Sequence, residues 1–176
     1  MVAKLSAVQA DISALAFEAI VNAANEPLIM GGGVGGAIRR KAGPGMEVEL
    51  RHIGRCPAGE AIITGGHALA ARFVIHTVAP IWSGDAAHRE SDERLLANCY
   101  RNSLALAREH EISEIAFPSL GTGAYGWPAD LAANTAHGAV CEFLQAHSGI
   151  MHVIFCCFSR SDLDRYNALI AGRSAP

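Results

Sequence analysis

The sequence lacks any block of about five or six basic residues, and its net charge at pH 7 is −3. Nucleic acids, which proteins hold mainly by neutralising phosphates, are therefore disfavoured partners, although a single bound phosphate group is not. Also missing are a run of about 18 apolar residues and an N-terminal charged region followed by an apolar core. We accordingly expect no sequence-specific nucleic-acid binding, no membrane partner and a cytoplasmic location.

Cysteine and histidine form no disulfide or metal pattern. The 5 cysteines are irregularly spaced, and Cys156 and Cys157 are adjacent within an apolar run typical of a strand. Neighbouring residues of a strand point to opposite faces of the sheet, so we expect these thiols to be buried and reduced. No His-Glu-x-x-His motif and no close Cys/His cluster occurs, which predicts no metal site and no cofactor. His76, inside a β-like run, is interpreted as a hydrogen-bonded core histidine.

Three common enzyme motifs are absent or misplaced. No serine lies in a Gly-x-Ser-x-Gly elbow, and the Gly-x-x-x-x-Gly-Lys-Ser/Thr motif of a P-loop nucleotidase does not occur. Gly31-x-Gly33-x-x-Gly36 formally matches the dinucleotide fingerprint, but that motif follows its strand directly, whereas residues 22–30 intervene here. The position about 20 residues later, where an acid should end a strand, falls in a loop near Cys56. A hydride-transfer fold is therefore rejected.

What the sequence does contain is mostly apolar. Hydrophobic residues make up 51% of the chain and charged residues only 18%, a balance typical of a sheet buried on both faces. A length of 176 residues is enough for a full core. No repeat, low-complexity segment or linker divides residues 1–176, so we expect a single domain.

The apolar pattern predicts alternating strands and helices. Apolar, β-branched runs predict strands at residues 3–9, 19–21, 61–64, 72–78, 112–118 and 151–158. Helical periodicity predicts helices at residues 37–42, 44–52, 91–110, 130–147 and 162–171, the third of them capped by Ser91. The close spacing of 61–64 and 72–78 predicts an antiparallel pair. Because strands and helices alternate in the second half, we expect an α/β three-layer sandwich with a largely parallel sheet.

A glycine-rich segment follows the second predicted strand. Residues 21–25 (Val-Asn-Ala-Ala-Asn) lead into residues 30–38 (Met-Gly-Gly-Gly-Val-Gly-Gly-Ala-Ile), where a helix is expected from Ala37. Glycines let the backbone approach a ligand, and a helix N-terminus favours negative charge. The segment therefore predicts an anion site, with a plain glycine-rich surface turn as the alternative.

A second glycine loop, residues 119–128, follows the strand expected at 112–118. Tyr125 lies among its glycines, where the ring either faces a sugar or base or packs on its own domain. Ligands of parallel sheets bind beyond the carboxyl ends of the strands, so two such loops at one edge predict a clamp for a diphosphate. Asp11, after the first strand, is interpreted either as a turn cap or as a ligand-binding carboxylate.

Six segments, in order, resemble the macrodomain family, the ADP-ribose-binding module of the Appr-1″-p-processing type. They are residues 10–12, 21–25, 31–38, 59–64, 74–80 and 121–126, which span nearly the whole chain and are jointly specific. The resemblance implies a three-layer α/β/α sandwich with a mostly parallel, mixed six-stranded sheet. It also implies a cleft for ADP-ribose at the strand ends.

By position, the resemblance also implies roles for individual residues. Asp11 would accept a hydrogen bond from the adenine amino group beside the Ile12 backbone, and Phe158 would lie against the adenine. Asn25 would hold hydroxyls of the distal ribose, flanked by Tyr125. The implied ADP-ribose-binding set is Asp11, Ile12, Ala23, Asn25, Gly32, Gly33, Val34, Gly35, Gly121, Thr122, Gly123, Ala124, Tyr125 and Phe158. Its glycines would cradle the diphosphate, so we expect Gly33 and Gly123 to tolerate no side chain.

One departure from the family pattern bears on catalysis. The hydrolytic branch carries an aspartate after the valine of the glycine loop, where this chain has Gly35, and Met30 replaces the first glycine. The missing general base is a group typically worth about 10²–10⁴-fold in rate, although some members without it still hydrolyse. The favoured hypothesis is a mono-ADP-ribosyl or O-acetyl-ADP-ribose hydrolase in which Asn25 and Gly33 position ribose and water. The alternatives are a non-catalytic reader of free or protein-linked ADP-ribose and a partner-binding domain without a ligand.

Overall fold

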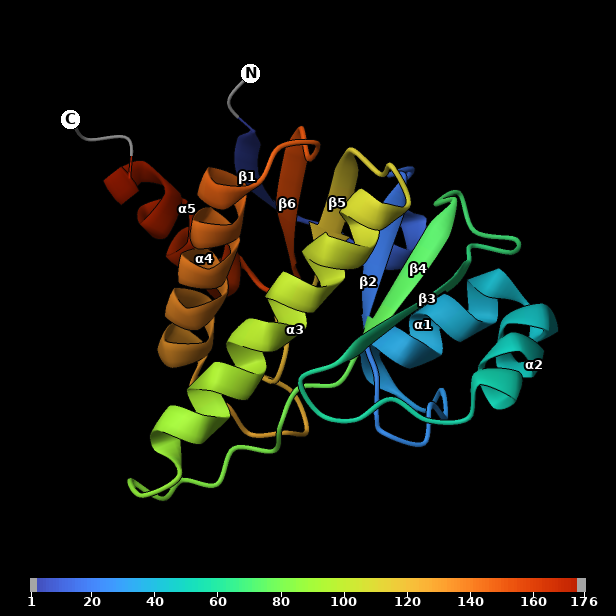
Figure 1. Ribbon diagram of the computed structural model, residues 1–176, viewed down its shortest axis with the longest axis horizontal. Coiled ribbons are helices and arrows are strands. Elements are labelled where there is room, and N and C mark those ends of the chain that lie inside the picture. The colour runs from blue at the N-terminus through green and yellow to red at the C-terminus, as the bar shows by residue number, and fades with distance from the viewer. Residues whose placement is uncertain (1–2, 174–176) are drawn as a thin grey trace.

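The computed structural model describes residues 3–173, which build one six-stranded sheet in the order β1-β6-β5-β2-β4-β3 (Figure 1). The strands are β1 (Lys4–Gln9), β2 (Ala19–Ala23), β3 (Ala61–Gly65), β4 (Phe73–Thr77), β5 (Glu114–Phe117) and β6 (His152–Cys157). β1, β6, β5, β2 and β4 pair in parallel, and β3 pairs antiparallel with β4. The expected mostly parallel, mixed sheet and its antiparallel pair are confirmed.

Helices cover both faces of this sheet. α1 (Gly33–Ala42) and α2 (Pro44–Ile53) pack on one face, together with the short 3₁₀ turn Ile12–Ala14. α3 (Arg89–Glu109), α4 (Ala129–Ala146) and α5 (Arg160–Arg173) lie side by side over the other face, as Figure 1 shows. The three-layer α/β/α sandwich is thus confirmed. Among residues 3–173, no helix combines the length and apolar character that crossing a membrane requires.

Alternate residues of the central strands enter two different cores, as the two-residue period of a strand requires. In β2, Val21 packs on the side of α3 and α4, whereas Ile20 packs on the side of α1 and α2. Cys157 and Cys156 divide in the same way, which confirms that these buried thiols point to opposite faces. Burial raises the pKa of Cys156 to about 11 and that of Cys157 to about 12, so both thiols stay protonated and weakly nucleophilic.

α1 begins four residues before the helix expected from Ala37. Its first residue is Gly33, and Gly36 N donates to Gly32 O at 3.0 Å in the first turn. The low helix propensity of glycine hides this start in the sequence. Tertiary packing decides it instead, because Gly35 and Gly36 are buried at the start of the helix.

The expectation that Ser91 caps α3 is wrong. The helix begins at Arg89, and Ser91 lies in its first turn, where its hydroxyl donates to His88 O at 2.7 Å. Serine is common both at caps and within first turns, so the sequence pattern does not separate the two positions. The helix therefore begins two residues before its expected range of 91–110.

Candidate functional site

A cleft of about 1000 Å³ opens where the carboxyl ends of β1, β6, β5 and β2 meet. Figure 1 shows the connecting loops gathered at that edge of the sheet. The cleft brings together most residues that the sequence analysis singled out: Asp11, Ile12, Ala23, Asn25, Gly32, Gly33, Val34, Gly121, Thr122, Gly123, Ala124, Tyr125 and Phe158. Residues that lie more than a hundred positions apart in the chain thus face one cavity.

Gly35 is the exception, because it does not line the cleft itself. It lines an adjoining pocket of about 100 Å³ together with Asn22 and His76. A Cβ atom added at Gly35 would lie 3.4 Å from Asn22 Oδ1, which is an ordinary contact. The place of the family's aspartate is therefore a small polar pocket beside the cleft, open enough for a side chain.

The N-terminus of α1 forms part of the cleft lining through Gly32, Gly33 and Val34. Gly32 is the cap residue, no side chain caps the helix, and the first turn contains no acidic residue. The first N–H groups of a helix lack partners within it and carry the positive end of its dipole, which favours a bound anion. Gly33 has a φ of +57°, a conformation that disfavours any side chain, so the expectation for Gly33 has a basis in the backbone.

Arg40 lines the same cleft, and the sequence analysis did not single it out. It shares one face of α1 with Gly33 and Ala37, because these positions follow the spacing of a helix. That spacing becomes readable only when the helix is known to start at Gly33. Arg40 adds an exposed cation to the lining of the cleft.

The second glycine loop is built around the buried Trp127. The Trp127 indole Nε1–H donates to Pro80 O at 2.8 Å, and its backbone N–H donates to Gly121 O at 3.1 Å. Tyr125 packs partly against the core, as one interpretation of this ring proposed, and it also lines the cleft, where contact with a sugar or base stays a prediction. Its backbone carbonyl accepts from Trp82 N at 2.9 Å, which ties the loop to the segment after β4.

Within this loop the structure requires a glycine at Gly121, which the sequence analysis did not single out for this reason. Gly121 has a φ of +82°, and an added Cβ would lie 2.6 Å from Trp127 Cδ1. Gly123 has no left-handed φ and no atom within 4 Å of an added Cβ. Neither backbone strain nor packing among the described residues therefore forbids a side chain at Gly123, and its expected intolerance, which concerns the approach of a diphosphate, stays a prediction.

We predict that Gly121→Ala lowers the free energy of unfolding by about 2–4 kcal/mol, because left-handed strain and overpacking against Trp127 add together. Urea denaturation followed by tryptophan fluorescence measures this change. Gly123→Ala is the matched control and should stay within about 0.5 kcal/mol of the parent. Equal destabilisation of the two variants would show that the contact with Trp127 is not what constrains the loop.

Asp11 is a turn cap, as one of its two interpretations proposed. Its Oδ1 accepts from Ser13 N at 3.0 Å and Ser13 Oγ at 2.6 Å, and its Oδ2 accepts from Lys41 Nζ at 2.8 Å. The hydrogen bond from Lys41, with those from Ser13, holds the pKa of Asp11 below its usual value. The carboxylate also lines the cleft, so a ligand amino group would share it with Lys41 or displace Lys41.

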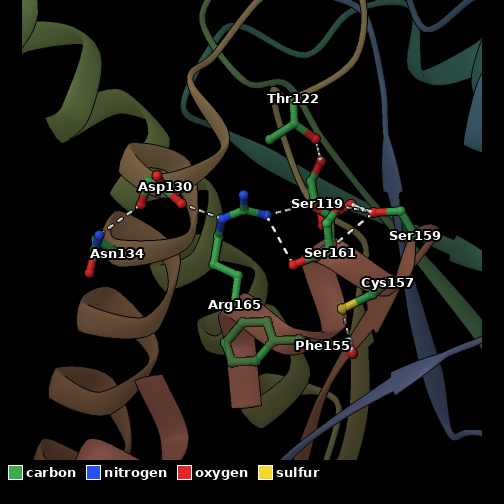
Figure 2. A network of polar contacts seen from close by, with 10 residues as sticks. Ser119, Thr122, Asp130, Asn134, Phe155, Cys157, Ser159, Ser161 and Arg165 are labelled. Carbon is green, nitrogen blue, oxygen red and sulfur yellow. Dashed lines mark hydrogen bonds and ion pairs between the residues drawn. The ribbon is translucent and has the colours of Figure 1, made fainter. Parts of the chain in front are cut away.

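Phe158 and Asp162, which follow β6 in the chain, also line the cleft. The Phe158 side chain is 93% exposed, which is unusual for a phenylalanine and leaves a whole ring face available. Asp162, which the sequence analysis did not single out, accepts from Arg165 Nη1 and from Ser159 Oγ, both at 2.8 Å. Figure 2 shows Arg165 reaching from α5 to Asp130 on α4 in the same network. This network fixes the wall behind Phe158.

Asn25 lies at the junction of the cleft and the small pocket. Its amide makes two reciprocal bonds with one residue: Nδ2 donates to Ile29 O and Oδ1 accepts from Ile29 N, both at 2.8 Å. The side chain therefore holds residues 25–29 in a closed turn, a role that the sequence did not indicate. An amide keeps one further N–H and one further lone pair, which leaves Asn25 able to bind a ligand hydroxyl.

His76 is a hydrogen-bonded core histidine, as expected. It is fully buried, with Nδ1 3.0 Å from Asn22 Nδ2 and Nε2 2.9 Å from Thr64 Oγ1. Burial lowers the pKa of His76 from 6.5 to about 3, so the ring is neutral near pH 7. The three side chains form a buried series, Asn22–His76–Thr64, with one residue each from the adjacent strands β2, β4 and β3.

The lowered pKa of His76 predicts that acid destabilises the fold. Below pH 6.5 the unfolded chain protonates this ring while the folded protein does not, so stability is full above pH 6.5 and falls toward pH 3. At about 1.4 kcal/mol per pH unit, urea denaturation should show a loss of about 2 kcal/mol between pH 7.5 and pH 5. His76→Gln should lack this part of the pH dependence, and an unchanged slope would assign it to other groups.

Comparison with known proteins agrees with this arrangement. The model of the family described as "Macro domain" matches residues 21–136. A macro domain-containing protein of Chlorobaculum tepidum is 54% identical over 169 residues, covering 96% of each chain. The ADP-ribose glycohydrolase MACROD2 of Xenopus laevis is 46% identical over 164 residues, which cover 93% of this chain but 39% of that protein. The solved Oceanobacillus iheyensis macrodomain with ADP has a TM-score of 0.91 and 39% identity, covering 98% of this chain and 92% of that chain.

Proposed function

The chain belongs to the macro domain family, and from this premise we propose that it binds ADP-ribose in the cleft and hydrolyses it from an ester linkage. The linkage would join the distal ribose to an acidic side chain of a modified protein or to an acetyl group. The observation that carries the proposal is that both glycine loops line one cleft at the carboxyl ends of parallel strands. A relative named as an ADP-ribose glycohydrolase supports the reaction class.

The two ends of the cleft suit the two ends of this ligand. A diphosphate fits between the N-terminus of α1 and the second glycine loop. Backbone N–H groups at both places would stabilise its anionic oxygens by donating hydrogen bonds. The exposed ring of Phe158 offers a face for adenine, and the Asp11 carboxylate offers an acceptor for its amino group. The distal ribose then lies toward Asn25 and Tyr125.

For an acidic side chain esterified at the anomeric carbon, hydrolysis requires that water reach that carbon as the ester oxygen leaves. Asn25 would orient the ribose, while a phosphate oxygen of the ligand and the backbone of residues 32–35 would hold the water. Correct placement of both reactants lowers a barrier by up to about 7–11 kcal/mol at the limit, without any side-chain base. Geometry rather than a catalytic carboxylate would therefore supply most of the rate.

A non-catalytic reader is the second candidate, and one observation favours it. The only carboxylates that line the cleft within residues 3–173 are Asp11 and Asp162, and Lys41 and Arg165 bond to them. Neither lies at the N-terminus of α1, where the family's aspartate would be. Release of ADP-ribose from a glutamate-linked, automodified substrate distinguishes the candidates: release above the uncatalysed background supports the hydrolase, and its absence at saturating substrate leaves the reader.

Binding itself is tested by titration calorimetry. ADP-ribose should bind 1:1 in the micromolar range, at about −8 kcal/mol, and AMP should compete weakly because it lacks the second phosphate and distal ribose. Asp11→Ala should weaken binding by about 1.5–3 kcal/mol through loss of a charge-assisted hydrogen bond. Lys41→Met is the matched control: it frees the carboxylate and should leave the affinity equal or higher. If Asp11→Ala bound as tightly as the parent, Asp11 would have no part in adenine recognition.

A further inference from the structure

The Asn22 amide has one bonded end and one unbonded end. The residue is 2% exposed, and its Nδ2 lies 3.0 Å from His76 Nδ1. Its Oδ1 is buried and has no hydrogen-bond partner among the described residues. Because a Cβ at Gly35 would come within 3.4 Å of this oxygen, Oδ1 faces the pocket beside Gly35. A buried acceptor without a partner is costly unless something in the pocket donates to it.

His76 determines which end of the amide faces the pocket. A neutral imidazole carries one N–H, and Nε2 lies 2.9 Å from Thr64 Oγ1. With that proton on Nε2 and donated to Thr64, the bare Nδ1 can only accept, so it takes a hydrogen bond from the Asn22 NH₂ group. The amide oxygen is then turned toward Gly35. Thr64 lies outside the pocket lining and is joined to it only through the contacts of His76 and Asn22.

The pocket is the right size and in the right place for water. Its volume of about 100 Å³ exceeds the roughly 30 Å³ that one water molecule takes in the liquid. Ala23, Ala24, Asn25 and Gly32 line both the pocket and the cleft, so the two spaces adjoin at the residue assigned to the distal ribose. Gly35, which lacks a side chain, leaves this space open.

We propose that the buried chain Thr64–His76–Asn22 aims the Asn22 amide oxygen at a water molecule beside Gly35, and that this oxygen orients the water in place of the missing carboxylate. The inference rests on the proposed hydrolase function. The water oxygen bonds to the anomeric carbon, the ester oxygen leaves with its bonding electrons as a carboxylate, and the released proton passes to solvent. Asn22 accepts a hydrogen bond without taking the proton, since an amide is not a base at neutral pH.

The first test removes the amide oxygen and then replaces it. Asn22→Leu should lower kcat for release of ADP-ribose from the glutamate-linked substrate by about 10²-fold, with the Kd for ADP-ribose within about threefold of the parent. Adding Gly35→Asp to that variant should restore most of the rate, because the new carboxylate enters the same pocket. A merely structural role for Asn22 predicts no such rescue, and its absence would overturn the inference.

The second test acts from a distance and keeps Asn22. Thr64→Val removes the acceptor for Nε2–H, so the His76 proton moves to Nδ1 and the amide reverses, presenting NH₂ to the pocket. Nitrogen-15 NMR should show the Nε2–H form in the parent and the Nδ1–H form in Thr64→Val, with kcat lowered at least tenfold and Kd unchanged. Thr64→Ser, which keeps the hydroxyl, should restore both the parent spectrum and the parent rate.

The outcomes separate this inference from the function on which it rests. A parent that releases ADP-ribose while Asn22→Leu and Thr64→Val keep its kcat would overturn the inference alone. An Nδ1–H form in the parent would also overturn it, because the amide would then present the wrong end. A parent that binds ADP-ribose but releases none would overturn both the hydrolase proposal and the role of Asn22 in it.

Discussion

Gly33→Glu should abolish ADP-ribose binding while the protein stays folded. The new carboxylate would lie at the N-terminus of α1, the proposed diphosphate site, where a Cβ added at residue 33 meets no described atom within 4 Å and residue 33 lines the cleft. Two like charges about 4 Å apart repel by about 4 kcal/mol in a partly screened site, which corresponds to about a 10³-fold loss of affinity. Titration calorimetry with ADP-ribose should therefore show no binding below millimolar concentration.

The fold should survive this change for two reasons. A non-glycine residue at a φ of +57° destabilises the fold by about 1–2 kcal/mol. An acidic side chain in the first turn of a helix offsets part of this loss, because it interacts favourably with the helix dipole. Gly33→Gln is the matched control, since it adds the same bulk and strain without charge and should weaken binding much less. Unchanged affinity in a folded Gly33→Glu protein would remove the first glycine loop from the site.

Asn25→Ala should lower the rate of ADP-ribose release by about 10²-fold while weakening ADP-ribose binding by less than about tenfold. The amide is assigned to the distal ribose, so its loss misplaces the anomeric carbon relative to the water but leaves the adenine and diphosphate contacts intact. Single-turnover release from a glutamate-linked substrate, measured beside calorimetry, separates these two effects.

The structure adds a control for this variant, because Asn25 also closes the turn of residues 25–29 through Ile29. Ile29→Gly loosens the same turn and leaves the amide in place; the Ile29 side chain is 68% exposed, so little packing is lost. If Ile29→Gly slowed release as much as Asn25→Ala, the effect would belong to the turn and not to ribose orientation.

The sequence alone predicted the elements whose patterns are local. Apolar runs located all six strands, and the short connection between residues 64 and 72 predicted the antiparallel pair. The burial of Cys156 and Cys157 on opposite faces follows from the two-residue period of a strand. The two glycine loops were predicted to share one edge, since they follow strands of a mostly parallel sheet.

Resemblance supplied what local patterns could not, namely the assignment of separate residues to one ligand. Asp11, Asn25, Gly121 and Phe158 share no periodicity, yet they line a single cleft. Arg40 and Asp162 line it too and were not singled out, because the first depends on where α1 starts and the second on how α5 packs.

Only the tertiary structure decided the details that depend on contacts between distant segments. Gly121 must remain glycine because Trp127 lies against it, and Gly33 starts α1 because packing outweighs propensity. Asn22, Thr64 and His76 are buried polar residues of three strands, and no spacing in the chain shows that they bond in series. Sequence patterns indicate which residues of a segment face solvent and which face the core. The hydrogen-bond partner of a buried polar group depends instead on the order and register of the strands, which place His76 opposite Asn22.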